Sequence, residues 1–301
     1  MKNELSILIP VYNYDCTALV DGLCHQMLPL TSAGVRMEII VAEDGSTDKN
    51  TLRQNAKIAD YSNCHHIVRH QNVGRAAIRN FLTQASHYKW LLFLDCDMQL
   101  PHDEFLRRYL DSSGNEVVDG GFGVKENPPM LGHNLRYTYE WTAVPFHNVG
   151  HRQANPYRSF RTTNFMIRRD LMLSHLFDER FLHYGYEDVL FGKQLRQQQI
   201  DVCHIDNPMM LADLETNEVF VSKTEESLET LHQFRRDLRG YSRLLTTAEG
   251  IHLGFVRWLL RVGHRFFGPM ERRNLCGSNP RLNVFKLYKL GYYLTLTKND
   301  K

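Results

Sequence analysis

The chain has 301 residues, of which 43% are hydrophobic and 23% are charged, and its formal net charge at pH 7 is +2. This balance is typical of a globular protein and excludes an extended disordered chain, and the length suffices for one large α/β domain with an appendage. The six cysteines are scattered without a C-x-x-C pair, which favours a reducing compartment over a disulfide framework or a zinc site.

The N-terminal stretch MKNELSILIPVYNYD has an acidic residue, Glu4, and only a short apolar run, so it predicts no signal peptide. No window approaches about 18 uninterrupted apolar residues, so we expect no membrane-spanning helix. The expected location is the cytoplasm, with contact at the inner face of the membrane as a second option.

Short apolar runs alternate with segments of helical length in the first third of the chain. This alternation predicts βαβ units and a parallel sheet whose strands are buried on both faces. In open sheets of this kind, ligands bind at the carboxyl ends of the strands. The predicted strands are residues 6–11, 37–44, 65–70 and 89–97, and the predicted helices are residues 17–27, 49–61 and 74–88.

The middle of the chain has a different pattern. Residues 116–124 and 162–169 have strand character, and residues 186–199 have near-helical apolar spacing. Residues 127–162 have no clear period, which predicts a long functional loop region. The chain is predicted to be helical after about residue 225.

Two acidic residues, Asp95 and Asp97, stand where a buried strand ends. Residues two apart on an extended chain point the same way, so the two carboxylates would repel each other without a cation nearby. Carboxylate oxygens suit Mg²⁺ or Mn²⁺ bridging to a phosphate. A polar strand end without function is the alternative for the D-x-D tripeptide alone.

Five segments resemble, in order and spacing, the motifs of family 2 glycosyltransferases. They are SILIPVYN (6–13), EIIVAEDGSTD (38–48), QNVGRAAIRN (71–80), FLDCDMQLP (93–101) and FDERFLHYGYEDVLFGKQL (177–195). The resemblance covers about residues 4–235 and implies an inverting, nucleotide-sugar-dependent enzyme of the GT-A fold. That fold is a Rossmann-like α/β architecture with a mostly parallel central sheet flanked by helices.

The resemblance also implies a domain organisation. We expect a GT-A domain at residues 1–235, with a nucleotide-binding half at 1–101 and an acceptor and catalytic half at 102–235. Residues 236–301 are expected to form a basic, aromatic, helical C-terminal region. Within the acceptor half, aromatic residues Tyr137, Tyr139 and Trp141 suit sugar faces, although packing of the loop is an alternative role for them.

The motifs imply a site for the nucleotide-sugar. Tyr12 is expected to stack on the nucleobase, Asp44 is favoured over its neighbour to accept the base N–H, and Arg79 is expected to help hold the nucleotide or diphosphate. Paired guanidinium donors match phosphate oxygens better than a lysine does. The full expected set is Pro10, Tyr12, Asn13, Glu43, Asp44, Asn72, Arg75, Arg79, Asp95 and Asn164, the last with its side chain facing the donor sugar.

The resemblance assigns Asp97 to direct coordination of Mn²⁺ or Mg²⁺, with Asp95 contacting metal or ribose. Many enzymes of this fold add a histidine in a stretch that corresponds here to residues 207–217, where this chain has Leu211 and no histidine. His204 is a substitute candidate, with a structural histidine as the alternative.

Glu187 and Asp188 match the E-D motif, in which the second acid acts as the catalytic base. Inverting transfer needs a carboxylate that takes the proton from the acceptor hydroxyl as it attacks. We expect Asp188 to be that base. The plainer explanation of two acids in a first helical turn is a favourable interaction with the helix dipole.

The C-terminal region is strongly basic. Residues 241–301 contain 11 Lys and Arg against 3 Asp and Glu, and Arg257, Arg261 and Arg265 are spaced four apart among apolar residues. Such a segment can lie on an anionic membrane or pack onto the catalytic domain. No nucleic-acid-binding motif is present, so we expect no nucleic-acid partner.

The sequence therefore predicts transfer of a sugar from a UDP-sugar to a hydroxyl of a saccharide or lipid-linked saccharide. Two other classes stay open. A nucleotidyltransferase shares a strand-borne acidic metal site, and a non-catalytic GT-A-like protein would bind nucleotide or glycan only, an option that Leu211 keeps open.

Overall fold

The structure is a computed structural model that describes residues 2–114, 116–211 and 213–297. The chain forms two compact units, each built from segments that are not contiguous in sequence. As far as they are described, the first unit comprises Met1–Gly123, Phe146–Leu182 and Phe191–Asp213, and the second comprises Val124–Pro145, His183–Leu190 and Leu214–Lys301. The expected domain limit near residue 235 stays a prediction.

The described part of the first unit contains a seven-stranded sheet with the order β3-β2-β1-β4-β8-β6-β9. Strand β8 is antiparallel to both of its neighbours, and the other neighbouring strands are parallel. A second sheet has the order β5-β10-β7. The strands are β1 (Glu4–Val11), β2 (Arg36–Asp44), β3 (Cys64–Arg69), β4 (Trp90–Leu94), β5 (Met98–Gln99), β6 (Val117–Asp119), β7 (Phe122–Gly123), β8 (Asn164–Arg168), β9 (Val202–His204) and β10 (Met209–Leu211).

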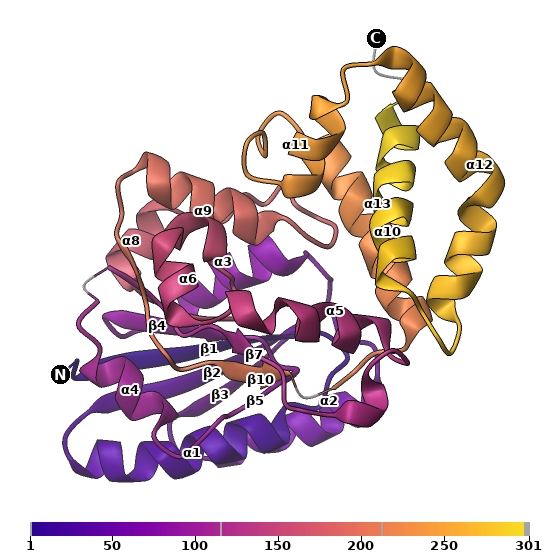
Figure 1. Ribbon diagram of the computed structural model, residues 1–301. Coiled ribbons are helices and arrows are strands. Elements are labelled where there is room, and N and C mark those ends of the chain that lie inside the picture. Colours follow the sequence, from indigo (N-terminus) through magenta and orange to yellow (C-terminus); the bar gives the residue numbers. More distant parts are fainter. Residues whose placement is uncertain (1, 115, 212, 298–301) are drawn as a thin grey trace. The chain divides into compact units, whose positions relative to one another are not determined.

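The central strands are buried on both faces, as continuous apolar runs predict. All five residues of β4 are buried, and so are eight successive residues of β2. Helices α1 and α4 lie along one face of the sheet and α3 and α8 along the other (Figure 1). The predicted α/β class with a mostly parallel, helix-flanked sheet is confirmed.

The helices follow the predicted positions closely in the first third of the chain, and the predicted helical character after residue 225 is confirmed. The helices are α1 (Thr17–Ser32), α2 (Lys49–Asn55), α3 (Arg75–Ala85), α4 (Phe105–Asp111), α5 (Leu135–Ala143), α6 (Val149–Ala154), α7 (Pro156–Ser159), α8 (Arg169–Ser174), α9 (Glu187–Gln197), α10 (Asn217–Gln233), α11 (Arg243–Gly250), α12 (Gly254–Cys276) and α13 (Leu282–Leu296).

The prediction of a long loop over residues 127–162 is wrong, because α5, α6 and α7 lie within it. Asn134 and Asn148 cap the first two of these helices through their side chains, and Pro156 opens the third. Helices of four to nine residues are too short to show a helical period in the sequence.

In the second unit, α10, α12 and α13 pack together. Their core contains Leu135 from α5 together with Val221, Leu275, Phe285 and Tyr288. None of the helices in the described ranges has the length and apolarity needed to cross a bilayer.

Candidate functional site

The carboxyl ends of three neighbouring strands carry the predicted nucleotide residues. β1 lies between β2 and β4 and is parallel to both. Residues 12–14, 43–48 and 95–97 therefore share one edge of the sheet, where open α/β sheets bind their ligands. The sheet order brings together segments that are more than 80 residues apart in the sequence.

Asp95 is held by two arginines of α3. Arg79 Nη2 donates to Asp95 Oδ1 at 2.7 Å, and Arg75 Nη2 lies 3.6 Å from Asp95 Oδ2. The Arg79 side chain is 1% exposed, whereas that of Arg75 is 42% exposed. Arg79 is therefore placed to fix the Asp95 carboxylate from the protein interior, and the Arg75 side chain stays partly open to solvent.

Asp44 is buried and uses both carboxylate oxygens to hold the loop before α3. Oδ1 accepts from Val73 N at 2.9 Å, and Oδ2 accepts from Gly74 N at 3.0 Å. Burial raises the pKa of Asp44 above its ordinary value, although the two backbone donors act in the opposite direction. The carboxylate thus ties the end of β2 to the start of α3.

Glu43 is fully buried beside it. Its oxygens accept hydrogen bonds from Asn55 Nδ2 at 2.7 Å and from Ser46 Oγ, and His66 Nε2 lies 3.3 Å away. Burial by itself raises the pKa of Glu43, but the hydrogen bonds from His66, Ser46 and Asn55 lower it below the ordinary value. The acid therefore stabilises the turn after β2 from inside the protein.

Asn13 joins the loops that follow β1 and β2. Its Oδ1 accepts from Thr47 N at 2.7 Å and from Asp48 N at 2.9 Å. Its neighbour Tyr12 is 52% exposed, so its ring is open to a ligand. Pro10 lies within β1 and is partly exposed.

A tight turn brings the end of β2 against the loop before α3. Gly45 has a φ of +72°, and a Cβ there would lie 2.3 Å from Asn72 N. The Asn72 side chain accepts from Gly74 N at 3.1 Å. Glycine is therefore required at position 45, and Asn72 shapes the loop that carries the arginine helix.

Tyr14 and Asp213 are site residues that the sequence analysis missed. The Tyr14 hydroxyl donates a hydrogen bond to Asp213 Oδ2. Tyr14 also interacts electrostatically with Asp97. Burial first, and then Asp213 and Asp97, raise the pKa of Tyr14 above its ordinary value. The sequence contains one indication for Asp213, because it lies in the stretch 207–217, where enzymes of this fold often supply a metal ligand.

The residues at this edge fit a divalent cation that is shared with a nucleotide. Among the described residues, no group of three or more His, Cys, Asp or Glu side chains is arranged to hold a metal. Mg²⁺ sites of phosphate-transfer enzymes commonly use one or two carboxylates and the phosphates of the substrate. Asp97, with Asp95 two residues before it at the same strand end, would supply the one or two carboxylates of such an incomplete protein shell.

His204 has a structural environment. It is buried, with Nδ1 2.9 Å from Arg152 Nη1 and Nε2 3.0 Å from Pro156 O. Asp119 lies 3.5 Å from Nδ1. Because both ring nitrogens contact protein groups, the arrangement supports the structural alternative over metal coordination.

Asn164 has a buried and fully hydrogen-bonded environment, and its expected contact with the donor sugar stays a prediction. It is 1% exposed, and Nδ2 donates to Gly121 O at 3.0 Å and to Asn207 O at 2.8 Å. Its Oδ1 accepts from Tyr109 OH at 2.6 Å. These bonds join the start of β8 to three other segments of the first unit, and they use both the oxygen and the nitrogen of the side-chain amide.

Glu187 and Asp188 open α9 and belong to the second unit. Glu187 is buried, and Asp188 is partly exposed. The two preceding residues have positive φ, 99° at Gly185 and 68° at Tyr186. A left-handed conformation is costly for a tyrosine, and such strain concentrates at functional sites. The conformation of this turn therefore sets the direction in which the Glu187 and Asp188 side chains point.

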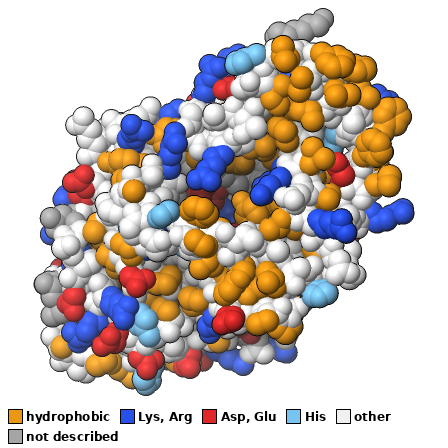
Figure 2. All heavy atoms as spheres, viewed as in Figure 1, with side chains coloured by type: hydrophobic (Ala, Val, Ile, Leu, Met, Phe, Trp, Pro, Cys, Tyr) orange, Lys and Arg blue, Asp and Glu red, His pale blue; other side chains and the backbone are white. Residues whose placement is uncertain are grey.

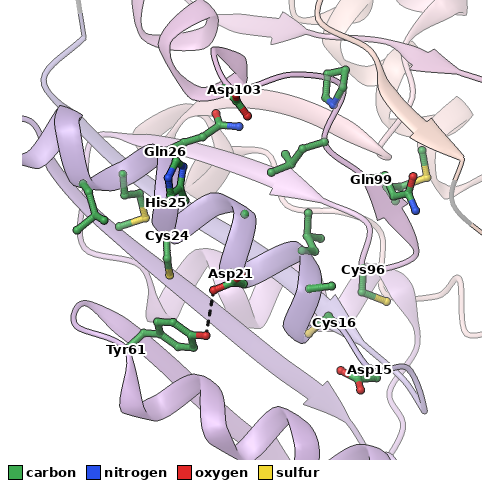
Figure 3. Close-up of a pocket in the computed structure, with 18 of the residues that line it drawn as sticks. Asp15, Cys16, Asp21, Cys24, His25, Gln26, Tyr61, Cys96, Gln99 and Asp103 are labelled. Atoms are coloured by element: carbon green, nitrogen blue, oxygen red, sulfur yellow. Dashed lines mark hydrogen bonds between the residues drawn. The ribbon is translucent and has the colours of Figure 1, made fainter.

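A cavity in the first unit runs along α1 and has a volume of about 1050 Å³. Its lining includes Tyr14, Cys96 and Asp213, which adjoin the strand ends, and also His25 and Asp103. Figure 3 shows lining residues distributed along α1, with Tyr61 hydrogen-bonded to Asp21. None of the predicted nucleotide residues lines this cavity, so it is an extension of the strand-end site and not its centre.

Comparisons with known proteins agree with this fold. Over 230 residues the chain is 27% identical to chondroitin synthase from Escherichia coli, covering 64% of this chain and 32% of that protein. Chondroitin synthase from Pasteurella multocida (strain Pm70) is 25% identical over 223 residues, covering 64% and 23%. The chain thus spans about a third or less of the length of these relatives.

Solved structures show the same fold at low identity. The mannosyltransferase PcManGT from Pyrobaculum calidifontis, in complex with GDP-Man and Mn²⁺, has a TM-score of 0.60 and 12% identity, covering 100% of this chain and 89% of that one. S. aureus TarS 1-349 in complex with UDP-GlcNAc has a TM-score of 0.52 and 16% identity, covering 99% and 91%. Residues 6–176 match the family described as glycosyl transferase family 2. That match includes more than half of the chain, and the chain belongs to this family.

Proposed function

We propose that the chain is an inverting glycosyltransferase that moves a sugar from a UDP-sugar to a hydroxyl of a saccharide or lipid-linked saccharide. The reaction would serve the biosynthesis of a polysaccharide or glycoconjugate, which accords with the names of the two curated relatives. The observation that carries the proposal is the acidic strand-end cluster, in which α3 arginines hold Asp95 next to Asp97. Because the chain belongs to glycosyl transferase family 2, we infer that this cluster binds a sugar donor.

Each exposed group at the strand ends has a part in donor binding. The open ring of Tyr12 stacks on the nucleobase, as aromatic faces do. The half-exposed Arg75 guanidinium offers donors to the diphosphate, whereas Arg79 positions Asp95. Mn²⁺ or Mg²⁺ held by Asp97 would neutralise charge on the departing UDP.

Asp188 is the proposed base. It takes the proton of the acceptor hydroxyl as that oxygen attacks C1 from the side opposite the diphosphate, which inverts the configuration at C1. Glu187, buried at the same helix start, helps to position this turn. Aromatic residues Tyr137, Tyr139 and Trp141 are the proposed acceptor contacts.

The proposal includes a contact of the basic C-terminal region with a membrane surface, which suits a lipid-linked acceptor. The location proposed is the cytoplasmic face of that membrane.

The decisive test is release of UDP from UDP-sugars with Mn²⁺, with and without saccharide acceptors. Asp188→Asn is expected to lower the rate at least 100-fold while UDP binding, measured by calorimetry, stays within about twofold. The donor screen starts with UDP-GlcNAc, bound by one fold neighbour, and includes GDP-Man, bound by the other, for which release of GDP is measured instead of UDP. Release of pyrophosphate, or a wild-type chain that binds UDP but transfers nothing to any acceptor, would contradict the proposal.

A further inference from the structure

Helix α12 of the second unit turns an apolar stripe outward. Phe255, Leu259, Phe266 and Met270 are between 52% and 71% exposed. Their spacing of four, seven and four residues places them on one side of the helix. Figure 2 shows hydrophobic side chains gathered over this part of the molecule. Single exposed apolar residues are ordinary in globular proteins, but a continuous row of large ones marks an interaction surface.

The polar side of the same helix faces inward. Arg261 Nε donates to Leu294 O at 2.8 Å, and its Nη2 donates to Thr297 Oγ1 at 2.9 Å. His264 packs edge-on against Tyr288, with 5.1 Å between ring centroids. A surface helix of a globular protein normally buries its apolar stripe. Over most of α12 the orientation is reversed, with Leu275 near its C-terminal end as the buried apolar exception, so the outer side of the helix suits apolar surroundings.

The charge of the helix indicates what those surroundings are. α12 contains five arginines and one glutamate. Arg265 and Arg273 are exposed next to the stripe, whereas Arg272 is paired with Glu225 at 2.9 Å. Trp258, which is 56% exposed, lies at the edge of the same stripe. Exposed arginines beside large apolar and aromatic side chains are typical of helices that bind anionic lipid surfaces.

We propose that α12 lies flat in the surface of a membrane that contains anionic lipid, with Phe255, Leu259, Phe266 and Met270 inserted at the acyl boundary. The row from Phe255 to Met270 is roughly 22 Å long at the rise of an α-helix. It is a convex ridge on one helix, which suits a deformable lipid surface. A contact with a second copy through the same stripe would instead place exposed arginines, Arg265 and Arg273 of each copy, in one interface, and like charges at an interface oppose binding.

This inference rests on the membrane contact of the proposed function and does not require sugar transfer, so the two can fail separately. The experiment is flotation of the full chain with vesicles of phosphatidylcholine alone or with about 30% phosphatidylglycerol. We expect at least tenfold more bound protein on the anionic vesicles. Trp258 fluorescence should shift to the blue on binding, and Trp258→Phe should remove most of that shift.

Two variants and a control make the test specific. Phe255→Ser with Phe266→Ser should lower binding to anionic vesicles at least tenfold, and Arg265→Gln with Arg273→Gln should remove most of the preference for anionic lipid. Leu28→Ser is the matched control, because Leu28 is 66% exposed on α1 of the first unit and should leave binding unchanged. Unchanged thermal unfolding would show that the variants fold.

Three results would overturn the inference. In the first, the wild-type chain does not float with either vesicle. In the second, the variant with Phe255→Ser and Phe266→Ser binds vesicles as the wild type does. In the third, the wild type binds no vesicles but forms a dimer, and the same variant is a monomer. The last result would assign the stripe to a second copy of the chain.

Discussion

The buried guanidinium of Arg79 donates to the Asp95 carboxylate at 2.7 Å, and only 1% of the Arg79 side chain is exposed. A buried arginine with this partner cannot reach out to a ligand without breaking the pair. We infer that Arg79 is a positioning residue, which holds one acid of the D-x-D element while Arg75 and Asp97 are the groups open to the donor.

Arg79→Met should therefore destabilise the protein strongly. Removing the buried, hydrogen-bonded partner leaves Asp95 with only the more exposed Arg75, 3.6 Å away, and we expect the free energy of unfolding to fall by roughly 3 kcal/mol. Urea denaturation measures the change. Arg75→Met is the matched control and should cost about 1 kcal/mol or less, since that side chain is more exposed.

Combining Arg79→Met with Asp95→Leu should recover much of the stability, because the buried carboxylate that lost its hydrogen-bonded partner is then removed as well. If Arg79→Met lowers the free energy of unfolding no more than Arg75→Met does, the Arg79–Asp95 pair does not stabilise the fold as we propose.

Gly45→Ala should disrupt the turn that joins β2 to the loop before α3. The new Cβ would lie 2.3 Å from Asn72 N, and the φ of +72° disfavours alanine as well. We expect a loss of roughly 3 kcal/mol or more, seen as a lower midpoint of thermal unfolding. Gly34→Ala separates the two causes, since Gly34 has a φ of +90° but nothing within 4 Å of a Cβ. Its cost should be about 1 to 2 kcal/mol, and equal costs at both sites would argue against the steric explanation.

Asp97→Asn should weaken nucleotide binding only when a divalent cation is present. An amide in place of the carboxylate removes a negatively charged ligand, so the affinity for UDP in Mn²⁺ should fall at least tenfold, by about 1.4 kcal/mol or more. In EDTA the variant and the wild type should bind UDP equally weakly. Titration calorimetry gives both values. Asp103→Asn, at the far end of the α1 cavity, should match the wild type under both conditions, and an equal loss there would point to a general effect of charge.

The stability of the second unit should depend on pH through Lys289. Burial lowers the pKa of this lysine to about 8, although Glu140 nearby raises it. Its ammonium lies 4.4 Å from the centre of the Phe285 ring. The ordinary pKa of lysine is about 10.4, so the unfolded chain binds more protons than the folded one between the two values. The Lys289 contribution to stability should thus rise with pH from about 8 to 10.

Lys289→Met isolates this effect from other titrating groups. At pH 7 the folded wild type carries the buried charge, so the variant should gain stability relative to the wild type, and that advantage should shrink by roughly 1 to 3 kcal/mol by pH 10. Urea denaturation of both proteins at several pH values measures the difference. A difference that stays constant over this range would exclude a lowered pKa for Lys289.

The sequence alone determined the layout of the first unit. Continuous apolar runs located β1, β2, β3 and β4 to within a few residues, because strands covered on both faces leave a local signature. The same signature located the acids and the aromatic ring that follow those strands. The short helices α5 to α7 left no such signature, and only the capping residues Asn134 and Asn148 marked two of them.

The tertiary structure decided what each site residue touches. Tyr14 meets Asp213 across 199 positions of sequence, and Asn164 and His204 are enclosed by partners from distant segments. Arg257, Arg261 and Arg265 look equivalent in the sequence, yet only the packing of α12 shows that Arg261 bonds to the end of α13 while Arg265 is exposed. Local patterns specify backbone conformation and the side of an element on which a residue lies. Which side is buried, and against which partner, depends on contacts between segments that no local pattern contains.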